Sequence, residues 1–502
     1  MSYAISGGHQ KTIEAAEVIL KQGGNAVDAA IAAYLVSFIA EPCMASIGAG
    51  GFAMVNDTRS VKMVDFFCET PKVKKRISDQ EFFPILIDFG NTQEEFQVGK
   101  GSIAVPGAIA GIYKMHERWG KIPMAELIQP ALKWSKEGIK IDKFQAYDFT
   151  LLKDIFKLNQ DGRNLILDDK GKLKEEGQTI KMPHYNDFLE VLKHEGQDLF
   201  YKGEIAKQVG ADLRDGGHLT RTDFENYEVH ISDPISFKFA GHKIYTTGFP
   251  SVGGMLITAL LNTFQDLVAR ETIPFLSTLH FQRLIDTFLK IQKLQNDPLR
   301  ISHYLINQFG INAPMIRNSK GSKWGGTSHF NVMDSDGMTV CLTTSIGEGS
   351  GYFIKGTDMQ MNNMLGEEAL MPNGFHNWDC DVRLQSMMSP SIVVDDLGNT
   401  LLGIGSGGAG RIPYAISQTI INLLFFGMDP HIAVDAPRIH IQDGTIEMET
   451  GFDIHKDLLP DSNIWNSKSL FFGGTNVLFK NNKMLEAIAD QRRFGAVINN
   501  YR

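Results

Sequence analysis

Thr327 is the residue in this sequence whose position best suits a nucleophile. It follows the pair Gly325-Gly326 and opens a run of β-branched and apolar residues (328–333). A second such run (338–345) follows after the link 334–337, which ends in Asp-Gly. Asp-Gly between two such runs is a strong turn signal, so the segment predicts a β-hairpin that begins at Thr327.

A threonine hydroxyl needs a base beside it to act as a nucleophile. Cleavage of the chain between Gly326 and Thr327 would free the α-amine of Thr327, and that amine can serve as the base. Gly326 gives the backbone the freedom that such a cleavage needs. Ser345, at the end of the returning strand, could orient the Thr327 hydroxyl. The same residues also fit an ordinary hairpin after a glycine-rich loop, so this stretch alone leaves both interpretations open.

A glycine-rich segment from Gly405 to Arg411 lies between a predicted strand and a predicted helix. It matches GxGxxG literally, a pattern of dinucleotide-binding folds. The chain after Gly410 is too short for a doubly wound sheet, and the helix runs to Gly427 without a second strand. We therefore interpret the segment either as backbone N–H groups at a helix start that could hold an oxyanion, or as a tight turn for packing.

Other catalytic patterns are not supported. The glycine-flanked serines Ser46, Ser350 and Ser406 do not fit GxSxG, and HExxH does not occur. The 14 histidines show no metal-binding spacing, and the 4 cysteines form no CxxC pair. His329 is expected to be structural. No metal or cofactor is therefore expected. The pairs Asn362-Asn363 and Glu367-Glu368 are candidates for substrate recognition, with a solvated turn as the alternative.

Composition limits the classes of function. The chain has 502 residues, of which 43% are hydrophobic and 21% charged, enough for a large core or two domains. A net charge of −9 and the lack of a basic, aromatic-rich cluster argue against nucleic-acid binding. The most apolar windows, near 29–40 and 418–426, are too short to cross a membrane. No secretory signal is visible at the N-terminus, so we expect a cytoplasmic protein.

The coarse pattern predicts an α+β protein. A helix pair is expected at 12–22 and 26–38, with Asn25 as the cap of the second helix. Later helices are expected at 255–264, 278–294 and 412–426. Strand pairs are expected within 53–66, 391–404 and 474–489. No low-complexity linker and no internal repeat is visible.

Together these pieces resemble the gamma-glutamyltransferase (gamma-glutamyltranspeptidase) family over nearly the whole chain. The motifs that carry the resemblance occur in the family's order. They are Gly23-Gly24-Asn25-Ala26-Val27-Asp28-Ala29-Ala30, Glu41-Pro42, Ile47-Gly48-Ala49-Gly50-Gly51-Phe52, Val105-Pro106-Gly107, Pro250-Ser251 with Gly253-Gly254, Thr327-Ser328-His329, Asn362-Asn363, Ser389-Pro390, Ala436-Pro437-Arg438, and Asp490 with Arg492.

The resemblance implies an N-terminal nucleophile (Ntn) hydrolase fold, a four-layer αββα sandwich. It implies self-cleavage between Gly326 and Thr327 into a large segment (1–326) and a small segment (327–502) that together form one domain. Thr327 would be the nucleophile, and Ser345 the second hydroxyl that bonds to it. The oxyanion would be held by the backbone N–H groups of Gly408 and Ala409, where alanine is tolerable if its backbone conformation is ordinary.

The residues that would bind the substrate α-carboxylate depart from the family pattern. The family's arginine is replaced by Phe67, and of the two carboxylate-binding serines Ser386 remains while the second position is Met387. Hydrogen bonds to charged groups contribute about 1.5–3 kcal/mol each, so these losses should weaken γ-glutamyl binding. Whether Lys74, Lys75 or Arg76 replaces the arginine is not evident from the sequence.

The residues that would bind the substrate α-amine are also altered. The family's acidic residue is Glu367, one carbon longer than the aspartate it replaces. Its asparagine and glutamine helpers are Gly347 and Met364. The catalytic residues thus resemble the family more closely than the acyl pocket does.

We predict an autoprocessing amide hydrolase and acyltransferase that cleaves γ-glutamyl amides such as glutathione through a threonine acyl-enzyme. Water or an amine would accept the acyl group, without a cofactor, nucleic acid or membrane, and formation of a homo-oligomer stays open. One alternative is a related acylase whose pocket, lined by Phe67, Met364 and Met387, takes a non-glutamyl acyl group. Another is an uncleaved, non-catalytic homologue.

Overall fold

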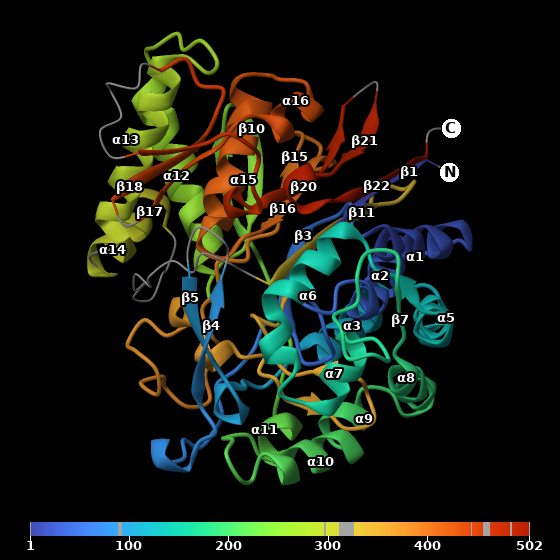
Figure 1. The fold of residues 1–502 in the computed structure, drawn as a ribbon. Coiled ribbons are helices and arrows are strands. Elements are labelled where there is room, and N and C mark those ends of the chain that lie inside the picture. Colours follow the sequence, from blue (N-terminus) through green and yellow to red (C-terminus); the bar gives the residue numbers. More distant parts are fainter. Residues whose placement is uncertain are drawn as a thin grey trace.

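The computed structural model describes residues 2–88, 93–295, 298–310, 326–442, 444–454, 462–481 and 484–500. Two large antiparallel sheets stack on each other, and helices cover their outer faces (Figure 1). This arrangement is the expected four-layer αββα sandwich, and the predicted α+β class is confirmed.

The first sheet carries Thr327 and has seven strands. In spatial order they are β22 (Ala496–Asn500), β1 (Tyr3–Gly7), β11 (Thr327–Met333), β12 (Thr339–Ser345), β2 (Gly50–Asn56), β3 (Val61–Phe66) and β8 (His230–Ser232). Strands from before and after residue 327 therefore lie side by side in one sheet. A cut at Thr327 would leave two polypeptides joined by the hydrogen bonds of this sheet.

The second sheet has six strands and packs on the first through β11, β12 and β16. In spatial order they are β21 (Leu485–Ile488), β20 (Gly474–Lys480), β16 (Thr400–Gly407), β15 (Ser391–Val394), β10 (His242–Thr246) and β9 (Ile235–Phe239). The strand pairs expected within 53–66, 391–404 and 474–489 are all present.

Two groups of helices form the outer layers (Figure 1). The first sheet is covered mainly by α1 (Gln10–Lys21), α2 (Ala26–Ala40) and α3 (Ala108–Trp119), and α5 (Gln129–Glu137) packs on α2. The second sheet is covered mainly by α12 (Val252–Val268) and α15 (Ile412–Ile420), and α13 (Thr278–Gln295) packs on α12. As expected, Asn25 caps α2, by accepting the backbone N–H groups of Val27 and Asp28.

The remaining helices and strands are shorter or lie at the periphery. The helices are α4 (Met124–Leu127), α6 (Lys143–Phe156), α7 (Gln160–Ile166), α8 (Pro183–Glu195), α9 (Asp198–Tyr201), α10 (Glu204–Asp212), α11 (Arg221–Glu225), α14 (Pro298–Phe309) and α16 (Pro430–Asp435). The small sheets pair β4 (Phe83–Asp88) with β5 (Gln93–Val98), β6 (Ile139–Lys140) with β7 (Thr179–Ile180), β13 (Phe353–Ile354) with β14 (Met359–Gln360), and β17 (Ile439–Gln442) with β18 (Thr445–Glu449) and β19 (Ser462–Trp465).

The helix expected at 412–426 differs from the prediction. It is α-helical only to Ile420, and residues Ile421–Phe425 form a π-helical turn.

Alternation along β11 places its two sets of side chains in different layers. Phe330 and Val332 are buried against the helices of the first layer, where the ring of Phe330 lies 6.2 Å from that of Tyr34 on α2. Side chains at positions i, i+2 and i+4 share the opposite face of a strand, so Thr327 points between the two sheets with His329 and Asn331. Asn331 confirms that direction, because its Nδ2 donates to Asn476 O on β20, 2.9 Å away.

Candidate active site

Thr327 is the first residue of β11 and lies opposite Ser345, the last residue of β12. The predicted hairpin is confirmed, with Asp334 to Met338 closing the turn. Thr327 is 5% exposed and Ser345 7% exposed, so both hydroxyl groups lie in a nearly enclosed site. His329 is also buried, and its ring nitrogens bond Thr343 Oγ1 (2.8 Å) and Asn331 Oδ1 (2.9 Å), a structural role as expected.

Ser345 contacts the peptide bond that the sequence predicts to break. Its hydroxyl donates to the carbonyl oxygen of Gly326, 2.7 Å away, and accepts the N–H of Gly347 at 3.0 Å. The resemblance led us to expect a bond to the Thr327 hydroxyl instead. In the continuous chain, Ser345 is therefore placed to polarise the Gly326 carbonyl.

Arg493 holds the other side of Thr327, and sequence reasoning missed it. Its Nη1 donates to the carbonyl oxygen of Thr327, 3.1 Å away. The side chain lies across two glycines, since a Cβ added to Gly407 would be 2.5 Å from Arg493 Nη1 and one added to Gly474 would be 2.8 Å from Arg493 Cδ. In the sequence, only the neighbouring family motif, Asp490 with Arg492, could have pointed to Arg493.

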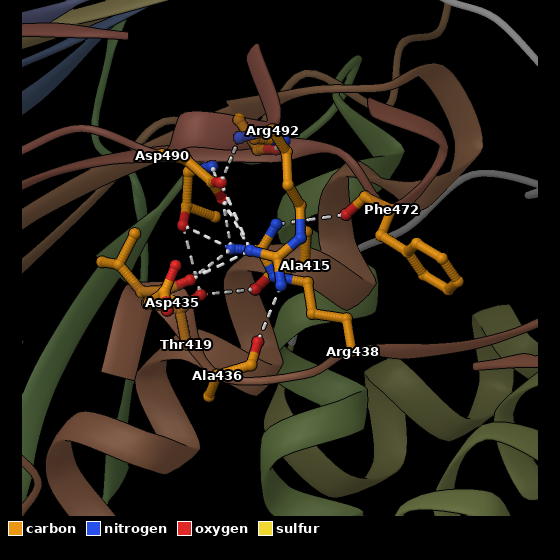
Figure 2. A network of polar contacts seen from close by, with 12 residues as sticks. Ala415, Thr419, Asp435, Ala436, Arg438, Phe472, Asp490 and Arg492 are labelled. Carbon is orange, nitrogen blue, oxygen red and sulfur yellow. Dashed lines mark hydrogen bonds and ion pairs between the residues drawn. The ribbon is translucent and has the colours of Figure 1, made fainter. Parts of the chain in front are cut away.

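A buried ion-pair network fixes the segment that carries Arg493 (Figure 2). Arg492 donates to Glu449 Oε1 at 2.7 Å, and Arg438 donates to Asp490 Oδ2 at 2.6 Å. Burial alone would raise the pKa of Asp490, but the guanidinium groups of Arg438 and Arg492 hold it below its ordinary value. Asp490 also accepts the N–H of Thr475 at the start of β20, so the network locks this end of the second sheet beside Thr327.

The expected oxyanion residues, Gly408 and Ala409, follow directly on β16. Gly408 has φ 123° and Ala409 has φ 48°, so both lie in the left-handed region. The condition that Ala409 have an ordinary backbone is therefore not met. A Cβ in this region costs roughly 1–2 kcal/mol, so the fold holds Ala409 in a strained conformation at the site.

The structure gathers most of the predicted site residues around one pocket with about 420 Å³ of empty space, part of it open to solvent. Thr327, Ser345, Gly326 and Ala409 lie at it together with the predicted substrate residues Phe67, Met364, Glu367, Ser386 and Met387. Gly408 and Gly347 do not line it. This pocket is the candidate acyl-binding site, because it opens on the predicted nucleophile.

The pocket wall at Phe67 is rigid and apolar. Its ring stacks on Phe52 with centroids 5.6 Å apart, and its backbone carbonyl accepts the Tyr227 hydroxyl at 2.7 Å. Arg383 also bonds this carbonyl, but its guanidinium is paired with Asp65 at 3.3 Å and does not line the pocket.

The basic residues that might have replaced the family's arginine are engaged elsewhere. Lys74 Nζ donates to the carbonyl oxygens of His376 and Trp378, and Lys75 Nζ to that of Arg214 at 2.9 Å. Arg76 does not line the pocket either. None of the three faces the acyl site.

Ser386 and Met387 are held by the glycine-rich start of α12. The carbonyl oxygen of Ser386 accepts the N–H of Val252 at 2.8 Å, and a Cβ on Gly253 would clash with the carbonyl of Met387. Ser386 Oγ accepts the N–H of Met388 at 3.1 Å. The Pro250-Ser251-Val252-Gly253-Gly254 motif thus shapes this wall by close backbone packing.

Glu367 is an acid in an acidic environment. The residue is partly exposed, but its Oε1 is buried and has no hydrogen-bond partner among the described residues. Burial and the carboxylate of Glu94 raise the pKa of Glu367 to about 8. Glu348, which is 0% exposed, has its pKa raised well above the ordinary value by burial and by Glu367 and Glu94.

Gly347 and Glu367 fit each other. A Cβ on Gly347 would clash with Glu367 Oε1. A side chain at 347 would require the carboxyl group of Glu367 and the side-chain oxygen of Asn363 to move, so the absence of one side chain leaves room for the extra carbon of the other.

Asn362 and Asn363 are structural, and the predicted choice between substrate recognition and a solvated turn was wrong. Both are 0% exposed. Asn362 accepts the N–H of Ala104 at 3.0 Å and donates to Gly48 O at 2.8 Å. Asn363 Oδ1 accepts the N–H of Glu348 at 2.9 Å, so it shapes the loop after β12.

A second cavity, with about 530 Å³ of empty space that is partly open to solvent, also borders Thr327. It is lined by His9, Glu41, Asp148 and Arg493 among others. Asp148 is 3% exposed, and its Oδ1 has no hydrogen-bond partner in the described part of the chain. Thr327 therefore lies between two cavities of different lining.

Within the described ranges, no group of three or more His, Cys, Asp and Glu side chains is arranged to hold a metal ion. In the same residues, no helix combines the length and apolarity that a membrane crossing requires.

Two stacked sheets between helical layers, with a threonine at the start of an inner strand, are the arrangement of the Ntn-hydrolase fold. A crystal structure of cephalosporin acylase from Bacillus halodurans has this fold, with a TM-score of 0.82 and 21% identity over 99% of this chain and 95% of that one. The family model described as Gamma-glutamyltranspeptidase matches residues 12–499. The chain belongs to the gamma-glutamyltranspeptidase family, as the motifs predicted.

Curated relatives agree with this assignment. The chain is 27% identical to the Glutathione hydrolase proenzyme of Bacillus subtilis (strain 168), covering 98% of this chain and 90% of the relative. It is 28% identical to the Glutathione hydrolase proenzyme of Escherichia coli (strain K12), covering 86% and 80%.

Proposed function

We propose that this protein is an autoprocessing amide hydrolase and acyltransferase of the γ-glutamyltransferase type, with Thr327 as its nucleophile. The observation that carries the proposal is the position of Thr327: it opens an inner strand, borders the acyl pocket, and follows a carbonyl that accepts the Ser345 hydroxyl at 2.7 Å. The relatives are named proenzymes, which supports maturation by cleavage.

Maturation begins in the continuous chain. Thr327 Oγ attacks the carbonyl carbon of Gly326, while Ser345 donates a hydrogen bond to the oxygen that becomes negative. The proton of Thr327 Oγ passes to the amide nitrogen, the C–N bond breaks, and this nitrogen leaves as the α-amine of Thr327. Water then hydrolyses the resulting ester. The products are the segments 1–326 and 327–502.

The mature enzyme repeats this chemistry on an amide substrate. The α-amine takes the proton of Thr327 Oγ as the oxygen attacks the carbonyl, and then gives it to the leaving amine. We assign the oxyanion to the N–H groups of Gly408 and Ala409 by the family pattern, although Ala409 is strained and Gly408 does not line the acyl pocket. Arg493 fixes the backbone of Thr327. Water or an amine then attacks the acyl ester, and we assign its approach to the second cavity because that cavity reaches Thr327 from outside the acyl pocket.

The family and the relatives' names favour γ-glutamyl amides, including glutathione, as acyl donors. An apolar acyl group is a second candidate, which the wall of Phe67, Met364 and Met387 supports. The test compares release of 4-nitroaniline from the γ-glutamyl anilide and from an apolar acyl anilide. Faster release from the apolar anilide would reject the γ-glutamyl assignment.

A denaturing gel tests the enzymatic proposal itself. We expect two bands, and the smaller polypeptide should begin at Thr327. A single full-length band after long storage would instead favour the uncleaved, non-catalytic homologue.

A further inference from the structure

We propose that the acyl pocket selects an acyl group that carries an amine but no carboxylate, of the 4-aminobutyryl type. The inference rests on the proposed function, because it requires that Thr327 be acylated from this pocket. It refines the substrate class: a γ-glutamyl group carries both an amine and a carboxylate, a glutaryl group only the carboxylate, and a butyryl group neither.

The lining of the acyl pocket carries one ionisable acid and no basic side chain among the described residues. Among the described residues that line the pocket, Glu367 is the one with an acidic or basic side chain. The rest of the wall is formed by apolar side chains such as Phe67, Met364 and Met387, and by the hydroxyl groups of Thr327, Ser345 and Ser386. A charged substrate group therefore meets one ionisable side chain, and it is an acid. The pKa of Glu367 is raised to about 8, and a bound ammonium group favours its ionised form.

One carboxyl oxygen of Glu367 is available as a hydrogen-bond acceptor for the substrate. Its Oε1 is buried without a hydrogen-bond donor. A buried carboxyl oxygen without a donor is unfavourable, and a substrate ammonium group supplies both the donor and the opposite charge. Gly347 leaves the space in which this carboxyl group lies, so its position is built into the backbone.

Other acidic side chains lie close to Glu367 and change the electrostatic potential at its carboxyl group. Burial and the carboxylate of Glu94 on β5 raise the pKa of Glu367. Besides burial, Glu367 in turn raises the pKa of Glu348, which follows β12, and that of the Cys68 thiol. A substrate carboxylate would disfavour the ionised forms of these acids further, whereas a substrate ammonium group would stabilise the ionised form of Glu367.

The cations near the pocket are not part of its lining. Arg493 donates to the carbonyl oxygen of Thr327 and lines the second cavity instead. Arg383 pairs with Asp65 and Glu69, and the Arg411 guanidinium lies 4.8 Å from the ring centroid of Phe471, attracted by Glu94. Neither side chain lines the pocket. Recognition of a carboxylate thus lacks a basic partner, while recognition of an amine keeps an acidic one.

The test uses the self-processed enzyme and four 4-nitroanilides: 4-aminobutyryl, γ-glutamyl, glutaryl and butyryl. We expect kcat/KM for the 4-aminobutyryl anilide to exceed each of the others by at least tenfold. Glutaryl or γ-glutamyl release at an equal or higher kcat/KM would overturn the inference and leave the amidase function standing. No release from any of the four by cleaved enzyme would overturn both.

A pair of variants assigns the preference to Glu367. Glu367→Gln keeps the shape of the side chain and should lower the ratio of 4-aminobutyryl to butyryl kcat/KM at least tenfold. Glu368→Gln removes the adjacent carboxylate, which is exposed and does not line the pocket, and should keep the wild-type ratio. A wild-type ratio in Glu367→Gln, or an equal fall in both variants, would contradict the role of Glu367. Thermal-shift measurements with 4-aminobutyrate and glutarate give a readout independent of turnover, in which only 4-aminobutyrate should stabilise the enzyme.

Discussion

The substitution Ser345→Ala tests whether the hydrogen bond to the Gly326 carbonyl drives self-cleavage. The Ser345 hydroxyl donates to Gly326 O at 2.7 Å in the continuous chain. As Thr327 attacks, this oxygen becomes an oxyanion, and the hydrogen bond strengthens. Loss of an oxyanion donor raises a barrier by about 2.7–4 kcal/mol, while a neutral hydrogen bond contributes about 1 kcal/mol to the ground state.

The difference between the two states sets the expected rate. Only stabilisation that is greater in the transition state accelerates the reaction, so the barrier should rise by about 1.5–3 kcal/mol. At about 1.4 kcal/mol per tenfold, cleavage of Ser345→Ala should be roughly 10- to 150-fold slower than that of the wild type.

The assay is a time course of intact-protein mass spectrometry after cell-free synthesis, with the uncut mass and the mass of segment 327–502 measured together. Ser345→Thr retains a hydroxyl and should cleave within a few-fold of the wild-type rate. Comparison of the melting temperatures of uncut Ser345→Ala and uncut Thr327→Ala separates a kinetic effect from misfolding. Cleavage of a folded Ser345→Ala chain at the wild-type rate would refute the role given to this hydrogen bond.

Three further predictions follow from the site and its supports. Ala409→Gly removes the Cβ at φ 48° and should raise the free energy of unfolding by up to about 1 kcal/mol in urea titrations, and unchanged or lower stability would argue against strain there. Arg492→Met leaves the buried Glu449 unpaired and should cost about 3–5 kcal/mol in the same assay. The pKa of Glu367 is raised to about 8, so the folded chain holds this proton more tightly than the unfolded chain. The resulting stability is complete below the unfolded pKa and is lost as pH rises through about 8, so melting temperatures should fall more over this window in the wild type than in Glu367→Gln.

Local signals in the sequence were enough to predict much of the fold. The Asp-Gly turn and the two β-branched runs defined the hairpin of Thr327, and Asn25 marked the start of α2. Both depend on neighbours within a few residues, for which turn and capping preferences are strong. The π-helical turn after Ile420 was not predictable, because the apolar pattern of 412–426 fits a regular helix equally well.

Contacts between distant segments limited the prediction of the site. Asn362 looks like a polar turn residue in the sequence, but Ala104 and Gly48 satisfy its side chain from elements more than 250 positions away. Arg493 is one of many surface-type residues by composition, and only the packing of the second sheet, through β16 and β20, on β11 brings it to Thr327. Burial of this kind is a property of the assembled sheets and cannot be inferred from spacing along the chain.

Gly347 and Glu367 show how the structure changes the meaning of a departure from the family pattern. In the sequence they count as two separate changes, each of which weakens recognition of the substrate amine. In the structure they are one change, because the carboxyl group of Glu367 occupies the space that a side chain at 347 would need. The departures at Phe67 and Met387 have no such partner, since no basic side chain among the described residues lines the pocket. The two parts of the family's substrate site have therefore diverged differently. The part that binds the amine keeps an acid, now one carbon longer, and the part that binds the carboxylate is replaced by an apolar wall.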